Sequence, residues 1–147
     1  MRRGARLSVV QALYEMEIGG RGVVEAMAEF EAFWIGKEVE DIELPKAEIN
    51  FFRDLLSGVV REQRLIDRSV DDVLASKWPL KRVEAVVRAI LRAGGYELAF
   101  RKDVPGRAVI SEYVAVARAF YEGEEIGMIN AVLDKLARDF REDEFDD

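Results

Sequence analysis

The chain has 147 residues, half of them hydrophobic and 35% charged, with a net charge of −7 and with neither cysteine nor histidine. This composition is typical of one globular domain with a hydrophobic core, and no apolar run reaches the roughly 18 residues that a membrane span needs. The missing cysteine and histidine exclude disulfides, thiol nucleophiles and Ser–His or Cys–His relays, and they argue against a structural zinc site. Any catalysis would therefore need paired carboxylates or a lysine. The N-terminal segment lacks the apolar stretch of a secretory signal, so we expect a cytoplasmic protein.

Hydrophobic residues recur at helical spacing in the first half of the chain. The first predicted helix ends at Gly19-Gly20, and its inward residues are Leu7, Val9, Val10, Leu13, Tyr14, Met16 and Ile18. A second helix is predicted over residues 23–35, with Val24, Met27, Phe30 and Trp34 inward, and an acidic connector follows over residues 36–45. Residues 47–74 predict one long helix. Gly58 lies inside it, which indicates a close approach of another helix, because glycine costs about 1 kcal/mol there.

Trp78-Pro79 is the predicted boundary between two lobes, residues 1–77 and 78–147, because the residue before a proline avoids helical geometry. The next helix begins near Val83, is expected to be interrupted at Gly94-Gly95, and resumes over residues 96–100. Residues 103–106 predict a turn, residues 109–121 a helix, residues 122–125 a polar loop and residues 126–140 the last helix. No segment alternates with the period of a strand. The predicted fold is all-α, a compact bundle of about seven helices within a single domain.

A cluster of arginines precedes the first acidic residue of the chain, Glu15. Arg2, Arg3 and Arg6 stand at the start of a predicted helix, where cations oppose the helix dipole at a cost of about 0.3–1 kcal/mol each. Arginines that lower the stability of a helix N-terminus without an evident compensating gain indicate a binding role. The planar guanidinium group of arginine also suits a phosphate group. The simpler interpretation is that these arginines pair with acids elsewhere on this acidic protein, and the residues alone favour it.

Two further groups of charged residues have simple structural explanations. Arg88 and Arg92 are four residues apart on one helix face, and an internal salt-bridge network explains them as well as an RNA does. The acids between Glu122 and Glu125 fit the start of a helix, where negative charge is favourable. Their spacing does not match a calcium-binding loop, so we expect no metal and no cofactor.

Several short motifs appear in one order along almost the whole chain. They are the arginine-rich start with Q-A-L-Y at residues 11–14, F-x-D-L-L-x-G-V at 52–59, K-W-P-L at 77–80, R-A-I-L-R…Y-E-L at 88–98, D-V-P at 103–105 and N-A-V-L-D-K at 130–135. Each motif is weak by itself. Together, from about Arg2 to Arg138, they resemble the NusB family of small all-helical bacterial antitermination factors.

The resemblance implies a two-lobed helical protein that is not an enzyme. Such a protein pairs with NusE, the small-subunit ribosomal protein, recognises boxA-type nascent RNA and helps RNA polymerase to resist termination on ribosomal RNA operons. The positions that match the family's RNA-binding residues are Arg2, Arg3, Arg6, Gln11, Tyr14, Arg107, Glu124 and Met128. The positions that match its NusE-facing helix are Arg88, Arg92 and Tyr96.

The chain departs from the family pattern at three positions. Gly4 replaces a basic residue, Val87 replaces a glutamate that would contact NusE, and Met128 replaces an aromatic residue that could stack on a base. An alternative hypothesis is therefore a self-associating helical interaction protein, a homodimer with Val87 on its surface and with weak or no RNA binding. An RNA-modifying enzyme is a third hypothesis, disfavoured because the chain has neither a glycine-rich cofactor loop nor a catalytic cysteine.

Overall fold

The computed structural model describes residues 2–38, 46–74 and 83–145, and every regular element in these ranges is helical. In chain order the elements are α1 (Arg2–Gly19), α2 (Val23–Glu38), α3 (Lys46–Arg61), α4 (Gln63–Leu74), α5 (Ala85–Phe100), α6 (Gly106–Ala117), α7 (Glu124–Phe140) and a short 3₁₀-helix, η2 (Glu142–Phe145). The predicted all-α class is confirmed. The Trp78-Pro79 boundary, most of the acidic connector and the side chain of Trp34 lie outside the described residues.

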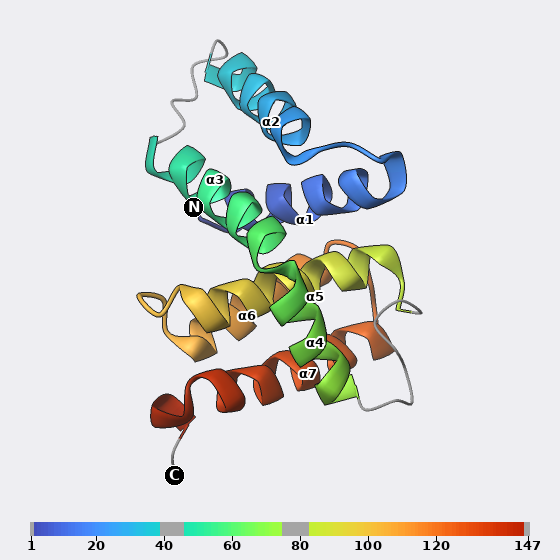
Figure 1. Cartoon of the computed structure of the whole chain (residues 1–147), viewed down its shortest axis with the longest axis vertical. Helices are drawn as coiled ribbons and strands as arrows, with labels where there is room; N and C mark the ends of the chain where they lie inside the picture. The colour runs from blue at the N-terminus through green and yellow to red at the C-terminus, as the bar shows by residue number, and fades with distance from the viewer. Residues whose placement is uncertain (1, 39–45, 75–82, 146–147) are drawn as a thin grey trace.

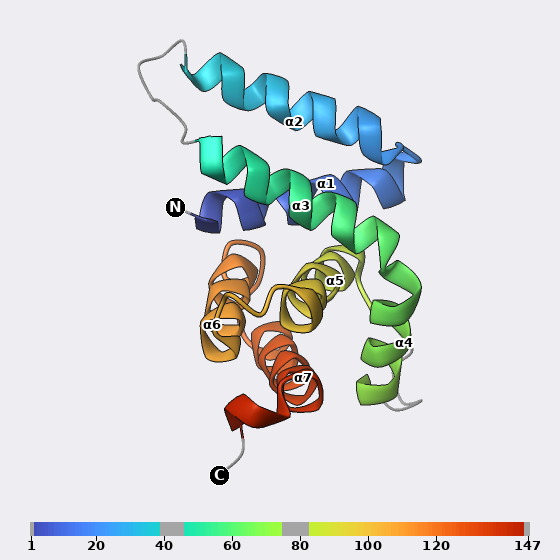
Figure 2. The same ribbon diagram turned by 60° about the vertical axis from the view of Figure 1, so that its left-hand side comes forward.

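The helix α5 lies at the centre of the bundle and packs against α1, α3, α4, α6 and α7. The helix α1 lies between α2 and α3 on one side and α5 and α6 on the other (Figures 1 and 2). By its contacts, α4 joins the group of α5 and α7, although it precedes the expected lobe boundary. This arrangement places α1 between the two groups of helices.

The predicted long helix over residues 47–74 is wrong, because the chain forms α3 and α4 with a change of direction at Glu62 (Figure 2). Backbone hydrogen bonds still cross the bend, from Glu62 N to Gly58 O at 2.9 Å and from Ile66 N to Glu62 O at 3.0 Å. The close approach expected at Gly58 is confirmed. A Cβ atom at this position would lie 2.1 Å from the ring carbon Cζ of Tyr96.

The interruption expected at Gly94-Gly95 is also wrong, since α5 continues through both residues. A Cβ atom at Gly94 would lie 2.8 Å from Cδ2 of Leu133 in α7, and one at Gly95 would lie 3.0 Å from Cγ2 of Ile66 in α4. The two glycines therefore let α7 and α4 approach the central helix. Close packing offsets the cost of about 1 kcal/mol that each glycine carries inside a helix.

The inward stripes are largely confirmed, but Tyr14, which was expected to point inward, is 37% exposed in the middle of α1, and the other errors fall near helix ends. Val9, Val10 and Leu13 are buried in the core. Ile18 and Val24, beside the turn between α1 and α2, are 62% and 77% exposed, which contradicts their expected inward position. Phe120 is also outside the core, because α6 begins earlier than expected, at Gly106, and ends at Ala117. None of the described helices has the length and apolar character needed to cross a bilayer.

Arg141 is surrounded by acidic residues in the sequence, but its role is to bind backbone carbonyl groups. Its guanidinium is buried and donates to the carbonyl oxygens of Glu97 at 2.9 Å, Leu98 at 2.9 Å and Arg101 at 2.8 Å, and also to that of Val104. A cation at a helix C-terminus satisfies the free carbonyl groups and complements the dipole. The segment after α7 thus caps α5 and holds the turn between α5 and α6.

Candidate nucleic-acid interface

The arginines at the start of α1 have different environments. Arg6 is 3% exposed and forms a two-point contact with Glu97 of α5, from Nε to Oε2 at 2.7 Å and from Nη2 to Oε1 at 2.9 Å. Tyr113 of α6 donates its hydroxyl to the same carboxylate, and burial, then the Glu97 charge, raise the pKa of Tyr113. Arg6 therefore ties α1 to α5 and α6. This burial corrects the expectation that its guanidinium faces RNA.

Arg2 and Arg3 lie at the surface. Arg3 is paired with Glu112, Nη2 to Oε2 at 2.7 Å, but its side chain is still 59% exposed. The guanidinium of Arg2 lies 4.4 Å from the ring centroid of Phe51, and that of Arg101 lies 4.9 Å from the same ring. The shared ring brings the start of α1 next to the end of α5. We call Arg2, Arg3, Arg101 and Lys102 the basic end.

Acidic side chains partly neutralise the basic end. Arg101 contacts Asp54 at 2.8 Å and Asp103 at 3.0 Å, and the hydrogen bond from Arg101 lowers the pKa of Asp103 to about 2. The hydrogen bond from Arg3 likewise lowers the pKa of Glu112. Exposed ion pairs of this kind contribute only about 0–1 kcal/mol. A phosphate can therefore replace a carboxylate at Arg3, whereas it cannot reach Arg6.

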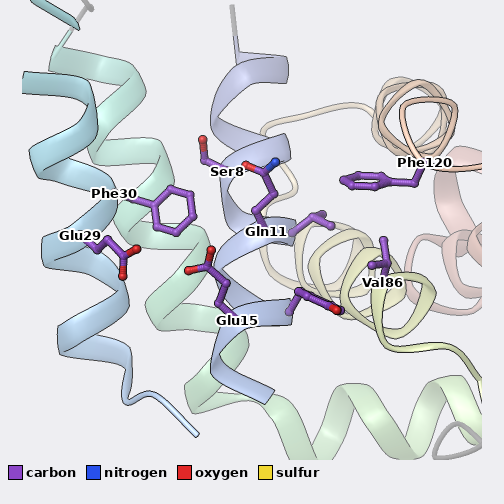
Figure 3. Close-up of a pocket in the computed structure, with 9 residues that line it drawn as sticks. Ser8, Gln11, Glu15, Glu29, Phe30, Val86 and Phe120 are labelled. Carbon is purple, nitrogen blue, oxygen red and sulfur yellow. The ribbon is translucent and has the colours of Figure 1, made fainter. Parts of the chain in front are cut away.

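A cavity of about 480 Å³ continues along the same helix (Figure 3). It is lined by Ser8, Val10, Gln11, Tyr14, Glu15, Glu29, Phe30, Val86 and Phe120. On one side of α1, Glu15 points toward Phe30 of α2, and on the other side Phe120 and Val86 face the helix (Figure 3). We call this cavity the α1 furrow. It contains Gln11 and Tyr14, two of the residues predicted to bind RNA.

The α1 furrow combines flat rings with polar groups. Tyr14 is 37% exposed and Phe120 is 38% exposed, so both rings offer surface to a ligand. Glu29 is paired with Arg21. By contrast, Oε2 of Glu15 is buried and has no hydrogen-bond partner among the described residues. Rings for stacking and groups for hydrogen bonding are what a protein needs to hold unstacked bases.

Of the other three residues predicted to bind RNA, Glu124 and Met128 lie one turn apart at the start of α7, and Arg107 lies away from both. The Arg107 guanidinium lies 4.8 Å from the ring centroid of Phe145, near the C-terminal end of α7. Glu124 is the first residue of α7, and the partly buried Met128 follows one turn later. A helix of 17 residues is about 25 Å long, so Arg107 and Glu124 lie at opposite ends of α7.

The three residues predicted to face NusE make internal contacts. Arg88 is 9% exposed, contacts Glu17 at 2.6 Å and donates to the carbonyl oxygen of Val83. Arg92 forms a two-point contact with Asp67 at 2.8 and 2.9 Å, and Tyr96 is 3% exposed against Gly58. These contacts join α5 to α1, α3 and α4, and NusE binding by the three side chains stays a prediction.

Two findings concern residues that the sequence interpretation misjudged or missed. Val87 is 2% exposed, which contradicts a self-association surface at this position. Glu15 was not predicted as a site residue, although its spacing of four from Gln11 places both on one face of α1. Phe30 and Phe120 carry no such signal, because only the tertiary structure brings α2 and the link after α6 beside α1.

The chain is similar to known proteins over nearly its whole length. A model of the NusB family matches residues 3–138. The transcription antitermination protein NusB of Rhodopseudomonas palustris is 62% identical over 145 residues, covering 98% of this chain and 83% of that protein. The homologue from Nitrobacter hamburgensis is 60% identical over 145 residues, covering 98% and 91%.

Solved structures show the same fold. NusB of T. maritima superposes with a TM-score of 0.80 at 26% identity, covering 99% of this chain and 96% of that one. A chain from a crystal structure of the antitermination factors NusB and NusE with double-stranded RNA gives a TM-score of 0.76 at 25% identity, covering 95% and 97%. The family match extends over nearly the whole chain and includes the α1 furrow and the basic end apart from Arg2. The chain belongs to the NusB family.

Proposed function

We propose that the protein is an RNA-binding antitermination factor that acts with NusE on boxA-type nascent RNA and helps RNA polymerase to resist termination on ribosomal RNA operons. The observation that carries the proposal is the outer face of α1, where Arg3 of the basic end and the furrow residues Gln11 and Tyr14 follow one another. Their spacings of eight and three residues keep them along one side of a helix. The relative crystallised with NusE and RNA supports both partners.

The two parts of this face suit different parts of an RNA strand. Arginine side chains at the basic end fit phosphate groups, which fix the position of the strand but carry no sequence information. The α1 furrow offers rings and hydrogen-bonding groups, which can hold unstacked bases. The net charge of −7 opposes RNA binding elsewhere on the surface, so the strand is confined to this face.

We expect NusE to bind the helices that Arg88 and Arg92 hold together. Arg88 and Arg92 both contact Glu17 at the end of α1, and Arg92 also holds Asp67 of α4. Ile18 is 62% exposed next to Glu17, and Leu65 of α4 is 43% exposed. Exposed apolar residues on rigidly held helices are suitable for a protein partner. We therefore place NusE against the end of α1 and α4.

Self-association is the second candidate function. The burial of Val87 removes the reason first given for it, but Ile18 and Val24 expose apolar surface beside the turn between α1 and α2. Two copies could cover this surface. Solution mass, measured by light scattering over a range of concentrations, tests this candidate: a constant monomer mass rejects it.

The test of the main proposal is binding to a boxA-type RNA and to a scrambled RNA, with and without NusE. We expect preference for boxA that increases with NusE. Changing Arg2 and Arg3 together to Ala should weaken binding at least about tenfold and should reduce the salt dependence of log K by about 1.4, at about 0.7 per lost phosphate contact.

A matched control removes two exposed arginines from α4, Arg64 and Arg68, which are away from the basic end; the two double variants are compared on RNA without NusE, because α4 is part of the proposed NusE surface. The control should keep the affinity and most of the salt dependence of the parent protein. Equal losses in the two double variants would show that only net charge matters and would contradict RNA binding at the basic end. Equal affinity for boxA and scrambled RNA in the presence of NusE would contradict the boxA proposal.

A further inference from the structure

Phe100, the last residue of α5, keeps an aromatic ring at the surface in a fixed orientation. The residue is 40% exposed, although its ring stacks on that of Tyr96, with the two centroids 5.3 Å apart and the ring planes at 26°. Tyr96 is 3% exposed and packs against Gly58 of α3, so it holds the Phe100 ring in place from below. An exposed ring that is supported in this way is a preformed flat surface for a ligand.

Arginine side chains lie on both sides of this ring. Arg101 follows Phe100 in the chain and contacts Asp54 of α3 at 2.8 Å. Two turns later on the same face of α3, Arg61 donates to the hydroxyl of Tyr96 at 3.4 Å, one turn before Phe100 on α5. Phe100 therefore lies between Arg101 of the basic end and Arg61, whose side chain is 61% exposed.

The place of Phe100 along α5 favours RNA over NusE as the ligand. The end of α5 lies beside the start of α1, because Arg2 and Arg101 both contact the ring of Phe51, at 4.4 and 4.9 Å (Figure 1). Arg88, on the side where we place NusE, lies about 18 Å away along the helix axis. A strand with phosphates at the basic end would thus have a base within reach of Phe100.

The acids that pair with these arginines leave room for a phosphate. Arg101 pairs with Asp54 and Asp103, whose side chains are 44% and 55% exposed. Arg61 pairs with its chain neighbour Glu62 at 3.0 Å. Exposed ion pairs contribute little and are screened by salt, so a phosphate can compete for both arginines. A nucleic-acid strand has the complementary arrangement, a flat base with an anionic group on either side.

We propose that Phe100 is a base-stacking platform that extends the RNA path from the basic end along the side of α3 and α5. The proposal rests on the proposed RNA-binding function and adds to it a base-binding position outside the α1 furrow. Phosphates beside Arg101 and Arg61 would flank the stacked base. Stacking uses the flat face that every base has, so this position raises the affinity for any single strand without reading its sequence.

The test compares Phe100→Leu, which removes the ring but keeps an apolar side chain, with Phe100→Trp, which keeps a ring. Binding of a boxA-type RNA and of an oligouridine, each of roughly twelve nucleotides, is measured without NusE by fluorescence anisotropy at several salt concentrations. Phe100→Leu should weaken binding of both RNAs about tenfold, and Phe100→Trp should keep the parental affinity. Neither change removes a charge, so the salt dependence of log K should stay as in the parent protein.

Phe140→Leu is the matched control, because it makes the same change at a partly buried ring at the end of α7. This variant should bind both RNAs like the parent protein. A second measurement uses the unaltered protein and replaces the uridines one at a time by 5-iodouridine, which forms crosslinks to aromatic side chains on irradiation. Mass spectrometry should then find a crosslink to Phe100 from at least one position of the strand, even if Phe100→Leu fails to fold.

The outcomes separate this inference from the proposed function. Absence of binding to either RNA by the parent protein would overturn the proposed function itself. Parental affinity in Phe100→Leu, an equal loss in Phe140→Leu, or RNA binding without any crosslink to Phe100 would overturn only the stacking platform. If Phe100→Leu leaves RNA binding intact but weakens binding to NusE without RNA, the ring is a protein contact and the inference is rejected.

Discussion

Polar and charged side chains lie on both the inner and the outer face of α1, but they differ in how completely they are hydrogen-bonded. On the inner face, Arg6 is buried together with Glu97 and Tyr113, and both Arg6 and Tyr113 donate hydrogen bonds to the Glu97 carboxylate. On the outer face, Gln11 is exposed and Glu15 has a carboxylate oxygen without a donor among the described residues. Complete pairing marks charges that hold the fold together, whereas Oε2 of Glu15 is a buried acceptor that no described residue satisfies.

The same difference divides the arginines of the N-terminal cluster. Arg6 and Arg3 are one helical turn apart, and both contact Glu112. Only Arg6 also has the buried Glu97 as a partner, at 2.7 Å. The number of arginines in a cluster therefore says less about RNA binding than the burial of each one. Arg2 and Arg3 are the members that can exchange a contact within the protein for a phosphate.

The largest effect should follow from breaking the inner network. Glu97→Ala removes the two-point acceptor of Arg6 and leaves a buried cation without its main partner. Removing one member of a buried pair typically costs about 3–5 kcal/mol in the free energy of unfolding. Urea unfolding monitored by circular dichroism measures this loss. Glu122→Ala, at an exposed position, should change stability by no more than about 0.5 kcal/mol.

A loss below about 1 kcal/mol for Glu97→Ala would contradict the importance of the inner network. Such a result would mean that Arg6 reaches solvent or another acid at little cost. It would also reopen direct RNA contact by Arg6.

A smaller effect should follow from adding a methyl group at Gly58, where α3 packs closely against α5. Gly58→Ala would place a Cβ atom 2.1 Å from Cζ of the buried Tyr96, so the ring or the helix must move. Overpacking of this kind typically costs about 1–3 kcal/mol.

Gly127→Ala is the matched control, since a Cβ atom there meets nothing within 4 Å. The control should stabilise α7 by up to about 1 kcal/mol, because alanine favours a helix over glycine. Equal melting temperatures for the two variants would contradict close packing at Gly58.

The helices could be predicted from the sequence because their hydrophobic period is a local property of the chain. The core positions Val9, Val10 and Leu13 follow directly from that period. The continuity of α5 through Gly94-Gly95 did not follow, because the reason for glycine there is the approach of Leu133 and Ile66 from other helices. The bend at Glu62 was missed for a related reason, since α3 and α4 pack against different partners.

The binding face could be predicted only in part. Arg2, Arg3, Gln11 and Tyr14 were identified by resemblance; the structure places Gln11 and Tyr14 in the α1 furrow and Arg2 and Arg3 at the surface of the first turn of α1. The internal role of Arg6 depends on Glu97, which is 91 residues away in the chain. A pattern of neighbouring residues cannot reveal a contact between residues so far apart in the chain. Arg141 is a parallel case, because its acceptors at the end of α5 and in the turn that follows lie more than 35 residues before it.

The smallest expected effect concerns the ion pairs of the basic end and sharpens the contrast with the inner network. The pKa of Asp103 is about 2 in the folded protein and about 3.9 in an unfolded chain, chiefly because Arg101 donates to its carboxylate. A lowered folded pKa contributes stability that is present above about pH 4 and is lost as the pH falls to about 2. Because the side chain is 55% exposed, the contribution should be below about 1 kcal/mol.

Asp103→Asn should therefore lower the urea midpoint slightly at pH 7 and match the parent protein at pH 2. Asp72→Asn, at an exposed position on α4, is the control. If Asp103→Asn destabilised the protein as much as Glu97→Ala, the basic end would be part of the structural network, and its arginines would not be available to bind RNA.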